Sequence, residues 1–303
     1  MPRLIDAGHG EAIDLPALGD LLADARIDVR DEDAFASLGP ALARLGRNPR
    51  FLADCAIAEL KTRFRRQSAI NGYGPQVLML RASDGRFAVR ANLWPARADR
   101  VTRASGADAF FYDLPHDHNF PFLTYGYLGP GYWSDYYEVA ADPLRGVAGE
   151  AAGLRFVERA RLEPGRLMLY RMRRDVHVQL PPDRFSVSLN ILGIDPAQPW
   201  VDQFRYDIAT DTVAAALTHT PAEALVTLAV HCGGEGAELA RDMLHRHPCA
   251  RMQATALAAL AGQADGRALL EQAARGAGRV AAEAERRLRR MDASEADAAR
   301  AAG

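Results

Sequence analysis

The sequence predicts a mainly β core with helical segments on either side of it. Between residues 76 and 215, apolar and polar residues alternate with the period of two that is typical of strands. Turn signals divide this stretch into short runs. Residues 1–75 and 216–303 instead show apolar residues three to four apart, as amphipathic helices do. We therefore expect three segments along the 303-residue chain.

The first segment, residues 1–75, is expected to be helical and to pack on the β core. Its apolar stripes are Leu18, Leu21, Leu22 and Ala25, then Phe51, Leu52, Cys55, Ala56, Leu60 and Phe64. Pro40, Gly46 and Pro49 lie between the two stripes and indicate turns.

The central segment, residues 76–215, contains the clearest alternation. One run places Phe87, Val89, Ala91 and Leu93 on a single face, and a later run does the same with Phe185, Val187, Leu189 and Ile191. The turn signals are Asp84-Gly85, Gly129-Pro130-Gly131 and Glu163-Pro164-Gly165. Many short strands joined by turns favour an antiparallel sandwich or a small barrel.

The last segment, residues 216–303, is helical and rich in alanine. Breaks at Gly233-Gly234, Pro248, Gly262 and Gly276 divide it into short helices. Such helices resemble HEAT-type repeats, whose concave faces hold proteins or peptides. We therefore expect a surface for a protein or peptide partner on these helices.

Composition excludes several classes of protein. A formal net charge of -2 gives no argument for nucleic acid as a partner, and no apolar run is long enough to span a membrane. The first residues lack an apolar signal core, and the 3 cysteines are scattered. We expect a cytoplasmic protein with reduced thiols.

Three histidines are the most informative residues. His116 and His118 are two residues apart, so on a strand they share a face, and His177 precedes a later strand. Together they predict a three-nitrogen site for a divalent transition metal, with open positions for water, dioxygen or substrate. The alternative is that all three are structural histidines.

The pattern around these residues resembles the cupin superfamily, from Asp84 to Asp195. His116-Asp117-His118 matches the first cupin element, and Pro164-Gly165 followed by His177 matches the second. The glutamate that usually follows the first element is missing, so the chain resembles the three-histidine branch, whose members include thiol dioxygenases of the cysteine dioxygenase type. The resemblance implies a double-stranded β-helix barrel and a mononuclear Fe²⁺ site, with Zn²⁺, Ni²⁺ or Mn²⁺ as alternatives.

The auxiliary residues of cysteine dioxygenases are only partly present. Their Ser-His-Tyr relay falls on Ser188, Asn190 and Leu192, and their cysteine falls near Leu123. Arg81 and Arg90 are both candidates for the arginine that binds the substrate carboxylate.

Other candidate site residues follow from position. Tyr125, Tyr127, Gln179 and Asn190 are predicted catalytic residues, and Arg174 joins Arg81 and Arg90 as a predicted substrate-binding residue. Strand tyrosines more often pack in the core, an arginine in such a run more often lies on a solvated loop, and Gln179 could equally lie at the surface.

The preferred function is a non-heme Fe²⁺ oxygenase acting on a small molecule or on a peptide-borne residue. A metal-stabilised binding module, whose helical tail docks a protein or peptide, is the first alternative. A metal-dependent isomerase or hydrolase is the second. Analogy with cupins also suggests a homodimer.

Overall fold

The computed structural model describes residues 2–139 and 144–302. The chain divides into two compact units. The first comprises Met1–Ala141, Ala152–Gln198 and Arg205–Asp211, and the second comprises Asp142–Ala151, Pro199–Phe204 and Thr212–Gly303. Each unit contains hydrophobic core clusters of its own.

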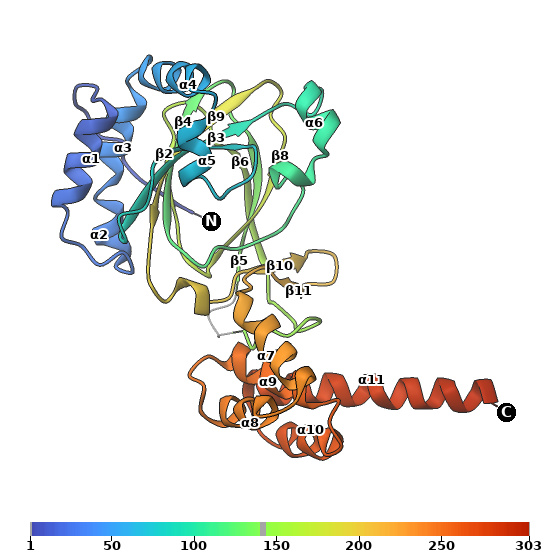
Figure 1. The fold of residues 1–303 in the computed structure, drawn as a ribbon. Coiled ribbons are helices and arrows are strands. Elements are labelled where there is room, and N and C mark those ends of the chain that lie inside the picture. Colours follow the sequence, from blue (N-terminus) through green and yellow to red (C-terminus); the bar gives the residue numbers. More distant parts are fainter. Residues whose placement is uncertain (1, 140–143, 303) are drawn as a thin grey trace. The chain divides into compact units, whose positions relative to one another are not determined.

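Two antiparallel sheets form the centre of the first unit (Figure 1). The larger has the strand order β1-β7-β4-β9-β3-β2, and the smaller has the order β6-β5-β8. The strands are β1 (Arg3–Leu4), β2 (Val77–Arg81), β3 (Phe87–Trp94), β4 (Phe122–Leu128), β5 (Trp133–Glu138), β6 (Arg155–Arg161), β7 (Leu167–Tyr170), β8 (Asp175–Leu180) and β9 (Ser186–Gly193). The predicted antiparallel β core is thus present. Its closure into one barrel stays a prediction, because the described strands form separate ladders.

Helices cover one face of the six-stranded sheet. They are α1 (Leu15–Asp24), α2 (Glu32–Ala36), α3 (Gly39–Gly46), α4 (Phe51–Lys61) and α5 (Arg65–Ile70). Leu22 of α1 and Leu42 of α3 belong to the same buried cluster as Val89 of β3 and Ile191 of β9. The apolar faces predicted for β3 and β9 therefore point at the helices.

The opposite face of this sheet is also buried. Trp94, Tyr136, Met168 and Tyr170 form a second, aromatic cluster there. As a result, every residue of β9 is buried, including the polar residues that alternate with its apolar ones. The connections on this side include α6 (Arg100–Ser105) and the 3₁₀ turn Asp108–Phe110.

Side chains of α5 and of Asn71, the residue that follows it, cover the open edge of β2, the last strand of the sheet. Gln67 Nε2 donates to the Met79 carbonyl at 2.8 Å, and Gln67 Oε1 accepts from the Met79 amide at 2.8 Å. Asn71 Nδ2 donates to the Val77 carbonyl, and Arg66 Nη2 donates to the Leu80 carbonyl. These bonds satisfy backbone groups that an edge strand would otherwise present to another chain.

The second unit contains helices packed around their own core. They are α7 (Pro221–Cys232), α8 (Gly236–Arg246), α9 (Ala250–Leu260), α10 (Gly266–Ala274) and α11 (Gly278–Ala302). A capping box joins Thr220 and Glu223 at the start of α7. The predicted helical C-terminal segment is present, whereas its HEAT-like character stays a prediction. A 3₁₀ turn (Gln198–Trp200) and a strand pair, β10 (Phe204–Asp207) with β11 (Thr212–Ala216), precede these helices.

No described helix has both the length and the apolar character that crossing a membrane requires.

Candidate metal centre

The three predicted histidines converge in the first unit. His177 lies on β8, His116 forms an isolated bridge to it, and His118 lies in the loop that leads to β4. The Nε2 atom of His177 is 3.1 Å from Nε2 of His118 and 3.2 Å from Nε2 of His116. All three side chains are buried. Among the described residues, no other group of three His, Cys, Asp or Glu side chains lies close enough together to hold one ion.

Backbone hydrogen bonds fix the positions of these rings. The His116 amide donates to the His177 carbonyl at 3.1 Å, and the His177 amide donates back to His116 at 3.0 Å. The Arg173 amide donates to the His118 carbonyl at 2.8 Å, with Arg173 in the left-handed conformation. His116 and His118 therefore share a face as predicted, although outside the regular strands.

The outer ring nitrogens determine which nitrogen faces the centre. His116 Nδ1 is 2.8 Å from the Leu114 carbonyl, which can only accept, so Nδ1 carries the proton. His177 Nδ1 is 3.2 Å from the Tyr170 hydroxyl, which itself donates to Tyr136. In this arrangement Nε2 of both rings presents a lone pair to the centre, as a metal ligand does.

Burial keeps these imidazoles neutral. It lowers the pKa of His116 to about 4. It also lowers the pKa of His177 and of His118, and His116 contributes to both shifts. Neutral rings with converging lone pairs repel each other unless a cation or a donor lies between them. Phe122 and Tyr170, whose rings contact His118, add to the apolar shell.

The spacing fits a transition metal. Two nitrogens bound about 2.1 Å from one ion at roughly right angles are about 3.0 Å apart. The two Nε2 separations at His177 are close to that value. A facial set of three neutral nitrogens leaves the remaining positions of a six-coordinate ion open.

Asp117 lies between the two histidines in the sequence but is not part of the cluster that could hold an ion. Its carboxylate is fully buried and accepts from the Tyr206 hydroxyl at 2.9 Å. Arg173 Nε lies 3.5 Å from the same carboxylate. Asp117 therefore anchors the segment between the two histidines from its far side.

A row of buried polar side chains crosses the six-stranded sheet beside this centre. Arg90 of β3 is directly opposite Asn190 of β9, which is directly opposite Thr124 of β4. Arg90 Nε, Asn190 Oδ1 and Thr124 Oγ1 are buried and have no hydrogen-bond partner among the described residues. The charge of Arg90 contributes to the lowered pKa of His118, after burial and the two other histidines.

Arg90 is the unusual member of this row. Its guanidinium is buried and stacks on the Tyr73 ring at 4.7 Å, and burial lowers its pKa. None of the described carboxylates forms an ion pair with it. Because a buried cation without a counter-charge is costly, this position favours an anionic ligand.

Some predicted site residues lie at the centre and others do not. Arg90 and Asn190 are in the polar row, and Gln179 is buried on β8 two residues beyond His177. Arg81 instead pairs with Asp84 at 2.9 Å, and Arg174 is exposed.

The two predicted tyrosines belong to the helix-covered face. Tyr125 is in the buried cluster with α1 to α4, and the Tyr127 hydroxyl donates to the Asn48 carbonyl at 3.0 Å. The structure therefore does not bring either of them to the histidines. Sequence reasoning missed Thr124 and Tyr170, and alternation from Phe122 and Tyr125 was the only signal for Thr124.

Comparisons with known proteins place this chain in no family. No protein-family model matches it, and no curated protein matches it. A solved structure of hydroquinone 1,2-dioxygenase, in complex with Cd²⁺ and 4-hydroxybenzonitrile, is 13% identical, with 42% of this chain and 68% of that chain covered and a TM-score of 0.27. The DMSP lyase of Ruegeria pomeroyi DSS-3 is 12% identical, with 65% and 78% covered and a TM-score of 0.25. Similarity this low carries no argument about fold or function.

Proposed function

We propose that the protein is a cupin-like, mononuclear non-heme Fe²⁺ oxygenase. The convergence of three neutral imidazole nitrogens, His116, His118 and His177, carries this proposal. When bound, Fe²⁺ would supply Lewis acidity and open positions for dioxygen and substrate. The chain contributes the ligand geometry, the apolar shell and the groups that orient a substrate.

The polar row gives the substrate its chemical class. Arg90 would bind a carboxylate or another anionic group, and Asn190 and Thr124 would donate or accept the neighbouring hydrogen bonds. Gln179 lies on the same strand as His177 and is the remaining candidate for contacting the substrate. The substrate is thus a small anion or an anionic residue of a peptide.

The test is the metal content and reactivity of the full chain. We expect one Fe²⁺ per chain after anaerobic reconstitution, and nitric oxide should bind it, as EPR would show, because positions are open. His118→Ala should lose the metal and remain folded. His245→Ala, which removes an exposed histidine of the second unit, is the matched control and should retain it.

Two results would contradict the oxygenase. One is stoichiometric iron that does not bind nitric oxide, which would indicate closed coordination and a structural metal. The other is tight zinc with no affinity for Fe²⁺, which would favour the isomerase or hydrolase.

A further inference from the structure

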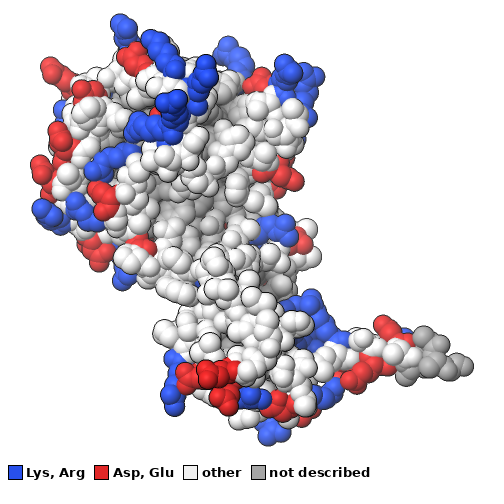
Figure 2. All heavy atoms as spheres, in the orientation of Figure 1, with Lys and Arg blue, Asp and Glu red and all other residues white. Residues whose placement is uncertain are grey.

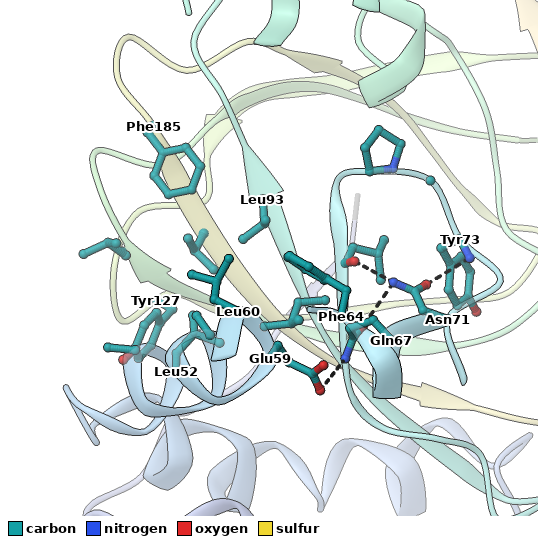
Figure 3. Close-up of a pocket in the computed structure, with 18 of the residues that line it drawn as sticks. Leu52, Glu59, Leu60, Phe64, Gln67, Asn71, Tyr73, Leu93, Tyr127 and Phe185 are labelled. Carbon is teal, nitrogen blue, oxygen red and sulfur yellow. Dashed lines mark hydrogen bonds between the residues drawn. The ribbon is translucent and has the colours of Figure 1, made fainter. Parts of the chain in front are cut away.

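A large apolar cavity lies on the helix-covered side of the first unit (Figure 3). Its volume is about 930 Å³, and its lining includes Leu52, Leu60, Phe64, Leu93, Tyr127 and Phe185. None of the three histidines lines it. Pockets that hold drug-sized molecules measure roughly 300–1,000 Å³ and are mostly apolar, so this cavity has the size and character of a ligand site.

Several large apolar side chains of this cavity are open to solvent. Leu60 is 62% exposed, Phe64 is 47% exposed and Phe185 is 45% exposed. Single exposed apolar residues are ordinary, but a group of them around one hollow marks a binding surface.

The backbone at Phe64 adopts a conformation that favours glycine. Arg63 and Phe64 both have positive φ, at 55° and 60°. The Phe64 amide donates to the Glu59 carbonyl at 2.9 Å, just beyond the end of α4 at Lys61. Non-glycine residues rarely adopt this conformation, and such strain is concentrated at functional sites. With this backbone conformation the Phe64 ring lies among the lining side chains (Figure 3).

Three cations adjoin the lining residues Leu60 and Phe64 along the chain, although they do not line the cavity themselves. Lys61, Arg63 and Arg65 are exposed, and none of them forms an ion pair with a described residue. Figure 2 shows basic side chains gathered over α4 and α5, although the chain as a whole has a net charge of -2. Among the described lining residues only Glu59 is acidic; it accepts from Gln67 Nε2 at 3.3 Å, turns toward Gln67 (Figure 3), and lies 3.7 Å from Arg66 Nη1.

We propose that this cavity is a second binding site, for a free amphipathic anion with a single aliphatic chain and a carboxylate head. The aliphatic chain of the ligand would lie against Leu60, Phe64 and Phe185. Its carboxylate would lie among Lys61, Arg63 and Arg65. Apolar burial supplies affinity, and the basic segment selects the sign of the charge. The proposal is independent of the metal centre and its chemistry.

The test is calorimetric titration of the full chain with dodecanoate below its micellar concentration. Dodecyltrimethylammonium, which has the same chain length and the opposite charge, is the matched probe. We expect one dodecanoate per chain, and binding of the cationic probe at least tenfold weaker. Equal affinity for the two probes, or no saturable binding of dodecanoate, would overturn the proposal.

Variants separate the two parts of the site. Phe64→Asn removes the ring but retains a residue that tolerates positive φ, and it should weaken dodecanoate binding about tenfold. The triple change Lys61→Gln, Arg63→Asn and Arg65→Gln should reduce the preference for the anion. Leu225→Ser, at an exposed apolar residue of α7, is the control and should change neither property. Unchanged binding in a folded Phe64→Asn protein would show that dodecanoate binds elsewhere.

Discussion

Arg171 joins the hairpin that carries His177 to the neighbouring strand. Its Nη2 lies 2.6 Å from Asp175 Oδ1 and 2.8 Å from Glu138 Oε1. Asp175 is fully buried at the start of β8, so this guanidinium fixes the beginning of the strand on which His177 lies. Hydrogen bonding to Arg171 lowers the pKa of Glu138 to about 2.

Stability should therefore fall in acid through Glu138. Its native pKa lies below its ordinary value, so the unfolded chain binds a proton that the native chain does not. The contribution is present above about pH 4.5 and is lost as the pH falls toward about 2. Because Glu138 is partly exposed, we expect about 1 kcal/mol. Urea unfolding at pH 7 and pH 3 measures it, and Glu138→Gln should show a smaller difference between the two pH values. An equal difference in both proteins would contradict this account.

Arg90 should lower the stability of the free protein and strengthen the binding of an anionic ligand. Arg90→Met removes a buried cation with no carboxylate partner, so the free energy of unfolding should stay the same or rise by about 1–4 kcal/mol. In Arg90→Met, an anionic substrate analogue should no longer raise the temperature of thermal unfolding. A large loss of stability in Arg90→Met would show that the native protein satisfies this charge internally.

At the scale of the elements, the alternation of apolar and polar residues along a strand could be predicted, but the burial of both of its faces could not. The apolar set Val187, Leu189 and Ile191 identifies β9 and its face. The sequence does not reveal that the opposite face, with Asn190, is buried as well, because that depends on a second sheet placed by distant residues. Face assignment also fails across irregular backbone. Tyr125 and Tyr127 were chosen because they follow His118 closely in the sequence, but loop residues separate His118 from β4, and both tyrosines lie on the helix-covered face.

Gln67 should contribute more to the stability of the protein than its place on α5 suggests. Gln67→Ala leaves the Met79 amide and carbonyl of the β2 edge without their side-chain partner. We expect a loss of about 1–3 kcal/mol in the free energy of unfolding, measured in urea, and an increased tendency to aggregate. Ser68→Ala, on the next residue of α5, is the control and should cost much less. Equal losses in the two variants would argue against edge protection.

For the molecule as a whole, the order of segments was predictable from composition, and the order of strands was not. Period-two and period-three-to-four patterns are local, so they identify β3, β9 and the helical C-terminal segment. Strand order depends on pairings between distant residues, such as β1 beside β7. Ligand convergence was nevertheless predictable, because His116 and His118 carry a spacing that few structural histidines share.

The two units should unfold separately. Each has its own buried core, and the histidine centre belongs to the first unit alone. Calorimetry of the full chain should show two transitions, and a bound metal should raise only one of them, by mass action. Chelation should reverse that shift. A single transition that moves as a whole would contradict independent unfolding.

The reciprocal amide bonds between His116 and His177 have a consequence for the cell. The polypeptide itself holds two of the rings in register, so swapping one ion for another requires no refolding. Occupancy should then follow the supply of each ion during growth, and protein purified from iron-starved and zinc-rich cultures should differ in content while sharing one fold.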